Sequence, residues 1–139
     1  MTLNAEEVLR LHVEIGKPLP VGETGAGTLT LIPITGGTFE GEMLRGRVLP
    51  GGADWSMQLY GGMTHVHARY WIETDDGAVI AVENEGYYNN LRADAVIRTT
   101  PRFTCDIHGK YAFLTRDVYA GELKGAGLNA VDIVVYRLD

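Results

Sequence analysis

The chain brings histidine, arginine and glutamate residues together between positions 63 and 85. His65, His67 and Arg69 alternate with apolar residues, and Glu83 and Glu85 follow after a turn. Imidazole groups titrate near neutral pH and transfer protons. A guanidinium group binds carboxylate or enolate oxygens through its planar fork. This combination predicts acid/base chemistry on a small molecule that gains negative charge on oxygen.

The turn at 74–78 predicts how these residues meet. Gly77 can adopt the left-handed conformation that closes a three-residue loop with a bulge, so that residue 74 faces residue 78. Residues directly opposite one another then lie about 5 Å apart at Cβ. The pairs in this register are Arg69 with Glu83, His67 with Glu85, and Trp71 with Ala81. A two-residue turn at Asp76-Gly77 would shift the register by one and remove these pairs.

Because side chains alternate along a strand, the hairpin has two different faces. One face carries His65, His67, Arg69, Trp71, Glu73, Glu83 and Glu85. The other carries Val66, Ala68, Tyr70 and Ile72. The polar face is either a solvated surface or the lining of a barrel mouth or lumen, where acid, base and anion-binding groups meet a ligand. Trp71 within the polar row favours the lining.

Four residues are candidate catalytic groups: Asp54, His67, Arg69 and Glu85. Asp54 follows a Pro-Gly-Gly turn and could be a general base, its pKa raised by desolvation in a pocket walled by Trp55. An aspartate at this position can instead cap the turn. His67 beside Glu85 would be oriented for proton transfer, or would be a structural or solvated histidine. Arg69 would stabilise a developing oxyanion, or would only pair with Glu83.

Five residues are candidate substrate-binding groups: Trp55, Tyr70, Trp71, Glu83 and Arg98. The two tryptophans would form walls of the pocket. Tyr70 and Arg69 point to opposite faces of their strand, so both can touch one ligand only where a bulge intervenes. Arg98 shares a face of its strand with Arg102, and the two could provide a second contact to an anion.

The sequence predicts neither a metal nor an organic cofactor. His65, His67 and Glu73 share a face and are plausible metal ligands, but the glutamate falls too far along for the first cupin motif, and no second cupin motif follows. There is no phosphate-binding loop, dinucleotide fingerprint or Gly-x-Ser-x-Gly elbow. Cys105, the one cysteine, is expected to be a buried thiol rather than a nucleophile.

The elements that must position these groups are short strands separated by glycine. Alternating or β-rich segments predict strands at 8–15, 28–35, 39–49, 53–59, 63–73, 78–85, 96–107, 111–119 and 128–138. Gly36-Gly37 is predicted to be a turn, and 86–94 to be irregular or briefly helical. The 18 scattered glycines suit the bends of a barrel. We therefore predict an all-β fold, a single antiparallel β-barrel domain of roughly nine strands over residues 1–139.

Composition limits the partners and the compartment. The 139 residues are 45% hydrophobic and 22% charged, ordinary values for a domain that folds without a disulfide. The net charge of −6 disfavours nucleic acid and anionic membranes as partners. The acidic N-terminus does not resemble a signal peptide, and no apolar run approaches a membrane span of about 20 residues. We expect a cytoplasmic protein.

Several motifs resemble one known family. They include Gly36-Gly37-Thr38-Phe39-Glu40-Gly41, Gly51-Gly52-Ala53-Asp54-Trp55, Ala68-Arg69-Tyr70 and Arg98-Thr99-Thr100-Pro101-Arg102-Phe103. The chain is similar, from about residue 8 onward, to the bacterial and fungal family called domain of unknown function 3237. This resemblance implies a small antiparallel β-barrel, lipocalin-like in outline, that often forms homo-oligomers.

The chain departs from that family at the polar hairpin. His67 stands where the family usually has aspartate, and Glu83 and Glu85 stand in a segment that is often basic. Phe113-Leu114-Thr115-Arg116 replaces the family's common Trp-Leu-Asn-Arg. A histidine facing acids in place of an acid facing basic residues would keep a charge-paired site with different proton chemistry, or would be neutral surface drift.

Two functions are compatible with these residues. The first is a cofactor-independent isomerase, cyclase or lyase that transfers protons on a small carbonyl-containing substrate. The alternative is a small-molecule carrier or sensor, a barrel that binds without catalysis.

Overall fold

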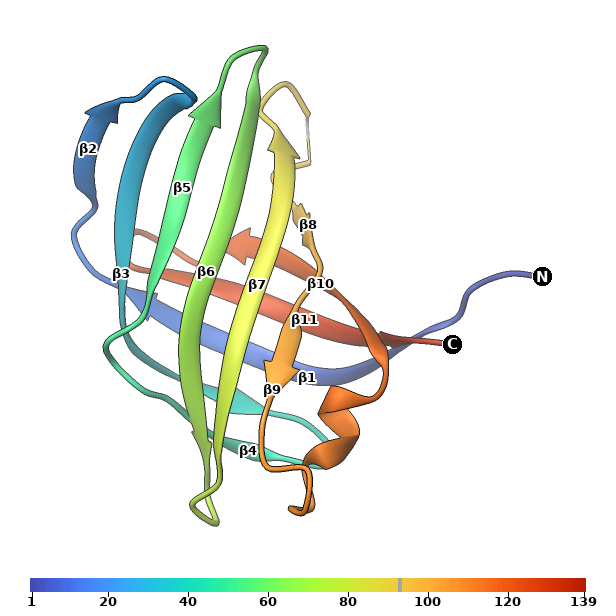
Figure 1. Cartoon of the computed structure of the whole chain (residues 1–139). Helices are drawn as coiled ribbons and strands as arrows, with labels where there is room; N and C mark the ends of the chain where they lie inside the picture. Colours follow the sequence, from blue (N-terminus) through green and yellow to red (C-terminus); the bar gives the residue numbers. More distant parts are fainter. Residues whose placement is uncertain (93) are drawn as a thin grey trace.

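The computed structural model contains the hairpin predicted around Gly77, formed by two long neighbouring strands of the barrel (Figure 1). The structure describes residues 1–92 and 94–139. β6 (Met63–Thr74) and β7 (Val79–Asn89) pair antiparallel, with Arg69 opposite Glu83 and His67 opposite Glu85. Gly77 has a φ of 91°, and its N–H donates to the Thr74 carbonyl at 2.9 Å. The predicted register of the hairpin is therefore confirmed.

Eight strands of the described chain close into an antiparallel barrel. Their order around the barrel is β6, β5 (Ala53–Leu59), β3 (Gly27–Glu40), β1 (Ala5–Ile15), β11 (Ala130–Leu138), β10 (Val118–Gly125), β8 (Ile97–Thr99) and β7. Three shorter strands are added to it: β2 (Leu19–Glu23) pairs with β3, β4 (Arg45–Val48) lies between β3 and β6, and β9 (Arg102–Thr104) pairs with β7. The predicted all-β barrel is confirmed, with eleven strands in the described residues instead of roughly nine.

β3 runs through the Gly36-Gly37 pair, where the sequence predicts a turn. Gly37 has a φ of 134° and lies so close to β1 that a side chain there would collide with the His12 carbonyl. A glycine inside a strand can signal close approach of another backbone as well as a turn. The bend lets β3 pair with β5 along one half and with β4 along the other. The prediction of one strand over 39–49 is also wrong. Its first residues are the end of β3, and residues 45–48 form the separate strand β4.

Two further predicted strands are wrong. The segment 96–107 is interrupted at Pro101, which has no N–H to donate to a ladder, and forms β8 and β9. The segment 111–119 begins as a short 3₁₀ helix, η1 (Ala112–Thr115), and β10 starts only at Val118. Residues 86–89, predicted to be irregular, continue β7. Within that predicted segment, Ala93 lies outside the described residues.

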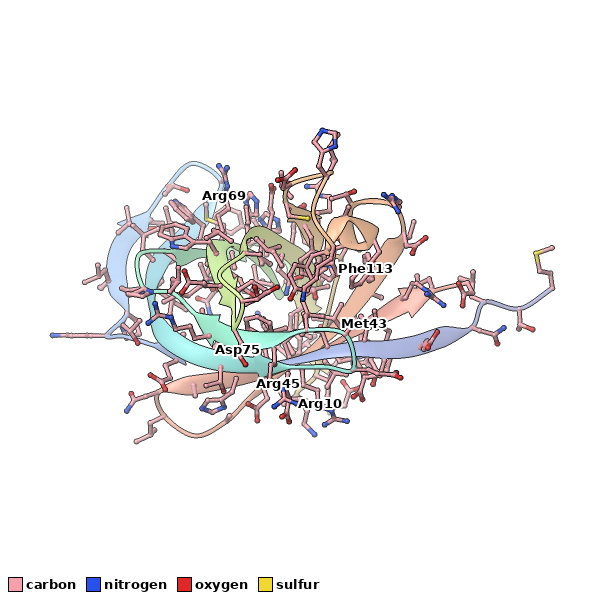
Figure 2. The ribbon with its side chains drawn as sticks, turned by 90° about the horizontal axis from the view of Figure 1, so that it is seen from below. Arg10, Met43, Arg45, Arg69, Asp75 and Phe113 are labelled. Carbon is pink, nitrogen blue, oxygen red and sulfur yellow. The ribbon has the colours of Figure 1, made fainter. Side chains whose placement is uncertain are left out.

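Apolar side chains fill the end of the barrel that carries the β6–β7 turn. Ile72 and Ile80 are fully buried there and share one core with Leu9 and Leu114. Seen from below in Figure 2, Phe113 of η1 and Met43 lie near one another at this end of the barrel. Among the described residues, no helix combines the length and the apolar character that crossing a bilayer requires.

Asp76 connects the β6–β7 turn to the segment that directly precedes η1. Its carboxylate accepts hydrogen bonds from Thr74 Oγ1 at 2.5 Å and from Tyr111 Oη at 2.8 Å. The ammonium group of Lys110 lies 2.9 Å from the other carboxylate oxygen. The contact with Lys110, followed by those with Thr74 and Tyr111, holds the pKa of Asp76 well below its usual range.

We expect Asp76→Asn to lower the melting temperature at pH 7. A carboxyl group with a depressed folded-state pKa stabilises the fold above its unfolded pKa of about 3.9, and this stabilisation is lost as the pH falls through the folded value. The deficit of the variant should therefore shrink as the pH falls below about 4. Thermal unfolding between pH 3 and pH 7 measures it, with the exposed neighbour Asp75→Asn as control. A deficit independent of pH would contradict the assigned role.

Candidate active site in the barrel lumen

The half of the barrel nearer the β5–β6 turn encloses a cavity of about 230 Å³. Apolar side chains from six strands form most of its wall, and Tyr70 borders it on the side of the packed core. A few polar side chains interrupt this wall: Asp54, Ser56, Thr64, Asn84 and Thr99. A largely apolar cavity with a few polar groups is the usual form of a small-molecule site.

Asp54 is the carboxylic acid of this cavity. It comes from β5, where the alternation of side chains turns it and Ser56 inward and Trp55 outward. Its Oδ1 accepts a hydrogen bond from the backbone N–H of His67 at 2.8 Å. Burial raises the pKa of Asp54 above its ordinary value, and the hydrogen bond from His67 opposes this shift only in part. The lumen thus holds a carboxyl group that protonates at a higher pH than an exposed aspartate.

Tyr70 supplies a neutral hydroxyl-bearing ring on the core side of the same cavity. Only 3% of its surface is exposed, and burial raises the pKa of its phenol. The phenol therefore keeps its proton throughout the neutral pH range and can donate a hydrogen bond. Of the proposed site residues, Asp54 and Tyr70 are the two that the structure brings together in the lumen.

Asn84 and Thr99 are two buried polar residues of the lumen that sequence reasoning missed. Each is 4% exposed. Within residues 1–92 and 94–139, neither Asn84 Oδ1 nor Thr99 Oγ1 has a hydrogen-bond partner. For Asn84 a signal was present, since the predicted register places it opposite Ala68 on the apolar face. Thr99 becomes part of the site only when β8 closes the barrel.

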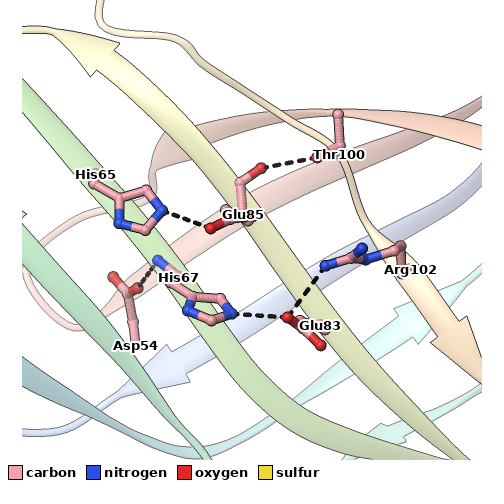
Figure 3. A network of polar contacts seen from close by, with 7 residues as sticks. All are labelled: Asp54, His65, His67, Glu83, Glu85, Thr100 and Arg102. Carbon is pink, nitrogen blue, oxygen red and sulfur yellow. Dashed lines mark hydrogen bonds and ion pairs between the residues drawn. The ribbon is translucent and has the colours of Figure 1, made fainter.

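The polar row of β6 and β7 lies on the outer surface of the barrel. Figure 3 shows that His65 and His67 contact the glutamates diagonally rather than directly across. His65 Nε2 lies 2.7 Å from Glu85 Oε2, and His67 Nε2 lies 2.9 Å from Glu83 Oε1. The strands are twisted, so diagonal neighbours come within reach. The interpretation that these groups line the lumen is wrong, because closure turns the opposite, apolar face inward.

Glu83 is the centre of this outer network. Besides its contact with His67, it accepts a hydrogen bond from Arg102 Nη2 at 3.3 Å. These neighbours lower the pKa of Glu83, and the hydrogen bond with His67 makes the largest contribution. Arg69 lies opposite Glu83 in the ladder, but the ion pair of Glu83 reaches Arg102 of β9. The pairing of His67 with Glu85 that the sequence predicts is correct for the backbone and wrong for the side chains.

Five of the proposed binding or catalytic residues line a shallow depression of about 370 Å³ on the outer surface: Trp55, Arg69, Tyr70, Trp71 and Glu83. Tyr70 is the one of these that also borders the lumen. Trp55 is 44% exposed and Trp71 is 39% exposed, so neither walls the pocket that contains Asp54. In Figure 2, Arg69 lies on the side of the barrel opposite Arg10.

Arg98 also faces outward, apart from this depression. Its guanidinium lies 3.6 Å from Glu122 and 3.8 Å from Asp94. It is adjacent in sequence to the inward-facing Thr99, which is the alternation expected of a strand. Arg98 therefore does not reach a ligand in the lumen.

The histidines do not form a metal centre with Glu73. Glu73 Oε1 accepts hydrogen bonds from Arg47 at 3.0 and 3.2 Å, while His65 and His67 each contact a different glutamate. The part of the chain that the structure describes has no group of three or more His, Cys, Asp or Glu side chains able to hold a metal ion.

Comparison with known proteins gives the family of this barrel. A family model described as "Protein of unknown function (DUF3237)" matches residues 3–138. The chain belongs to this family. A related UPF0311 protein of Rhodopseudomonas palustris (strain TIE-1) is 34% identical over 134 residues, which span 86% of this chain and 87% of that protein. The family resemblance predicted from the motifs is confirmed.

Solved structures share the DUF3237 barrel over its whole length. A beta-barrel like protein from Acinetobacter baumannii has a TM-score of 0.90 at 31% identity, covering 100% of this chain and 98% of that one. A protein from Penicillium herquei, described as an enzyme, has a TM-score of 0.79 at 22% identity, covering 100% and 96%. At this identity, the similarity to the Penicillium herquei protein shows a shared fold.

We expect Asp54→Asn to raise the melting temperature at pH 7. A carboxyl group whose folded-state pKa is raised destabilises the fold progressively as the pH rises above its unfolded value of about 3.9. The amide of the variant stays neutral, and its oxygen can still accept the hydrogen bond from the His67 N–H. The gain should vanish below about pH 4, the range in which the Asp76→Asn deficit also shrinks, so the two variants differ in the sign of their effect at pH 7. A loss of stability at pH 7 would contradict the assigned environment.

Proposed function

We propose that this DUF3237 protein is a cofactor-independent enzyme that transfers a proton on a small carbonyl compound held in the lumen. The observation that carries the proposal is the position of Asp54, an ionisable carboxyl group inside a largely apolar cavity. A general base works best when its pKa lies near the working pH, and burial moves the pKa of Asp54 in that direction. A titratable group whose pKa is shifted by burial inside a cavity is a candidate functional group.

The reaction would use the carboxylate as base and the carboxylic acid as donor. Asp54 takes a proton from the carbon next to the carbonyl, the C–H electron pair becomes the enolate, and Asp54 becomes neutral. Return of the proton to a different atom of the enolate completes an isomerisation. In a ring closure, the enolate carbon forms a bond to a second carbonyl carbon of the same molecule, and Asp54 protonates the alkoxide that results. In a lyase reaction, the enolate electrons form a C=C bond as the bond to a leaving group on the β-carbon breaks, and Asp54 protonates that group. The neutral phenol of Tyr70 can donate a hydrogen bond to the enolate oxygen, where negative charge develops.

The outer network has a different role in this proposal from the one that the sequence predicts. His67 acts through its backbone N–H, which holds the Asp54 carboxylate, while its imidazole contacts Glu83 on the outer surface. Arg69 and Glu85 likewise face away from the lumen. We therefore assign proton transfer to Asp54 and treat the three outer residues as external to the reaction.

A small-molecule-binding barrel without catalysis is the second candidate. It is favoured by the lining of the cavity, in which aliphatic side chains outnumber polar ones. The description of the Penicillium herquei protein as an enzyme supports catalysis on this fold. The two candidates differ in whether Asp54 exchanges a proton with a bound ketone.

Proton abstraction predicts deuterium exchange in a bound ketone. We expect the wild-type protein in D₂O to accelerate exchange of the C2 protons of 1-indanone above the buffer rate. Asp54→Asn should reduce this exchange to the buffer rate, because its amide cannot accept the proton, and NMR of the ketone measures both rates.

Outer-face variants are the matched controls. His67→Gln and Glu85→Gln should keep at least about half of the wild-type exchange rate, because their side chains lie outside the lumen. Exchange that survives Asp54→Asn but is lost in His67→Gln would place the chemistry on the outer face. Binding of 1-indanone without any catalysed exchange would favour the carrier.

A further inference from the structure

The polar residues of the lumen form a compact group across adjacent strands. Asp54 pairs with Ala68, and Ala68 pairs with Asn84, so the three form one transverse row on β5, β6 and β7. Neighbouring strands are about 4.8 Å apart, which places Asp54 and Asn84 roughly 10 Å apart at Cα. The small side chain of Ala68 between them leaves space for a ligand group that both can contact.

Thr99 extends this group in the next row toward the β5–β6 turn. It pairs with Gly86 on one side and with Gly121 on the other. A Cβ atom on Gly121 would collide with Thr99 Oγ1, and one on Gly86 would lie 3.1 Å from Thr99 Cγ2. Thr99 therefore has no side chain beside it in its row, and its neighbour on the diagonal is Asn84. The two glycines keep space around this hydroxyl.

Buried polar groups are normally hydrogen-bonded, and leaving one unpaired costs about 1–3 kcal/mol. Asn84 Oδ1 and Thr99 Oγ1 are both unpaired within the described chain, and both residues line the cavity. A hydroxyl group suits this pair, because it can donate to the Asn84 oxygen and accept from the Thr99 hydroxyl. Thr99 Oγ1 lies on the side of Gly121 and the Thr99 methyl group on the side of Gly86, so the contact to a shared hydroxyl uses a different rotamer of Thr99.

Charge and volume further restrict the ligand. Among the lining residues that the structure describes, Asp54 is the one acidic group, and none is Lys, Arg or His. An anion would therefore meet a carboxyl group with no cation to offset it. An apolar cavity of about 150 Å³ holds benzene, so the lumen accommodates roughly ten non-hydrogen atoms.

We propose that the lumen is a site for an uncharged, mostly apolar molecule of about ten non-hydrogen atoms whose hydroxyl group is bound by Asn84 and Thr99. This names the substrate class of the proposed function and rests on it for the location of the site. The hydroxyl would orient the molecule so that its reacting carbon faces Asp54 across Ala68. The subsite is independent of the outer-face histidines.

Binding of four probes with one indane skeleton tests this proposal. The probes are 1-indanol, indane, indane-1-carboxylate and 1-aminoindane, and calorimetry or NMR titration at pH 8 gives their dissociation constants. We expect the wild-type protein to bind 1-indanol about tenfold more tightly than indane, because the alcohol gains hydrogen bonds that the hydrocarbon cannot make. The carboxylate should bind more weakly than the alcohol because it meets Asp54 with no cation to offset it. The amine should bind more weakly because pairing with Asp54 does not repay the desolvation of both charges in a largely apolar cavity.

Two near-isosteric variants locate the hydroxyl contact. Thr99→Val and Asn84→Leu should each bring the affinity for 1-indanol to within about threefold of that for indane, without lowering the melting temperature, because each removes an unpaired buried group. A purely structural residue would lose stability instead. Thr104→Val, the same change at an exposed position, should leave the preference for the alcohol unchanged.

Three results would overturn the substrate class: equal binding of 1-indanol and indane, tighter binding of either charged probe, or an alcohol preference that survives both variants. These outcomes are separate from those of the exchange experiment. Alcohol preference without ketone exchange would leave a binding barrel with the proposed specificity. Ketone exchange that depends on Asp54 without alcohol preference would retain the enzyme and remove the substrate class.

Discussion

The constraint on which the site depends is the register of the β6–β7 ladder. Its eleven consecutive pairs leave no freedom to slip, because a shift by one residue would exchange the two faces of each strand. The Gly77 turn sets this register, and closure of the barrel then decides which face is inside. Val66, Ala68 and Tyr70 turn inward with Asn84, while every histidine and glutamate of the hairpin turns outward. The chemistry of the lumen therefore follows from one turn and one closure.

The local parts of this structure could be predicted from the sequence, and the non-local parts could not. Period-two patterns and Gly77 were sufficient for β6, for β7 as far as Glu85 and for their register, and the glycine-rich motifs indicated the barrel. Which face becomes the lumen depends on β1, β10 and β11, far away in sequence. The same cause explains the error at Gly36-Gly37, where the glycines allow close contact with β1 rather than a turn. The varied polar side chains along β6 led to the wrong prediction that their face lines the lumen. A buried site needs only a few polar groups, so the more polar face is not the better candidate.

The polar groups of the lumen work against stability. Ile72, Ile80 and Leu114 form an apolar core at the end of the barrel that carries the β6–β7 turn. The half that contains the cavity has a buried carboxyl group and two polar side chains with an unpaired atom. Aliphatic residues at these positions would avoid the desolvation cost. Proteins retain such costs where function requires them, since active sites are often destabilised relative to the rest of the fold. The outer network has a smaller cost, because its side chains are half-buried and keep contact with water.

We propose that ligands of this barrel bind inside the lumen. Mapping backbone and side-chain NMR shifts on addition of 1-indanone tests it directly. Both tryptophans of the chain, Trp55 and Trp71, face outward, so their indole N–H signals report on the outer depression. We expect shifts at the Asn84 side-chain amide and the Ala68 backbone amide, with both indole signals unchanged. Shifts confined to the two indoles would contradict it and place the site on the outer face.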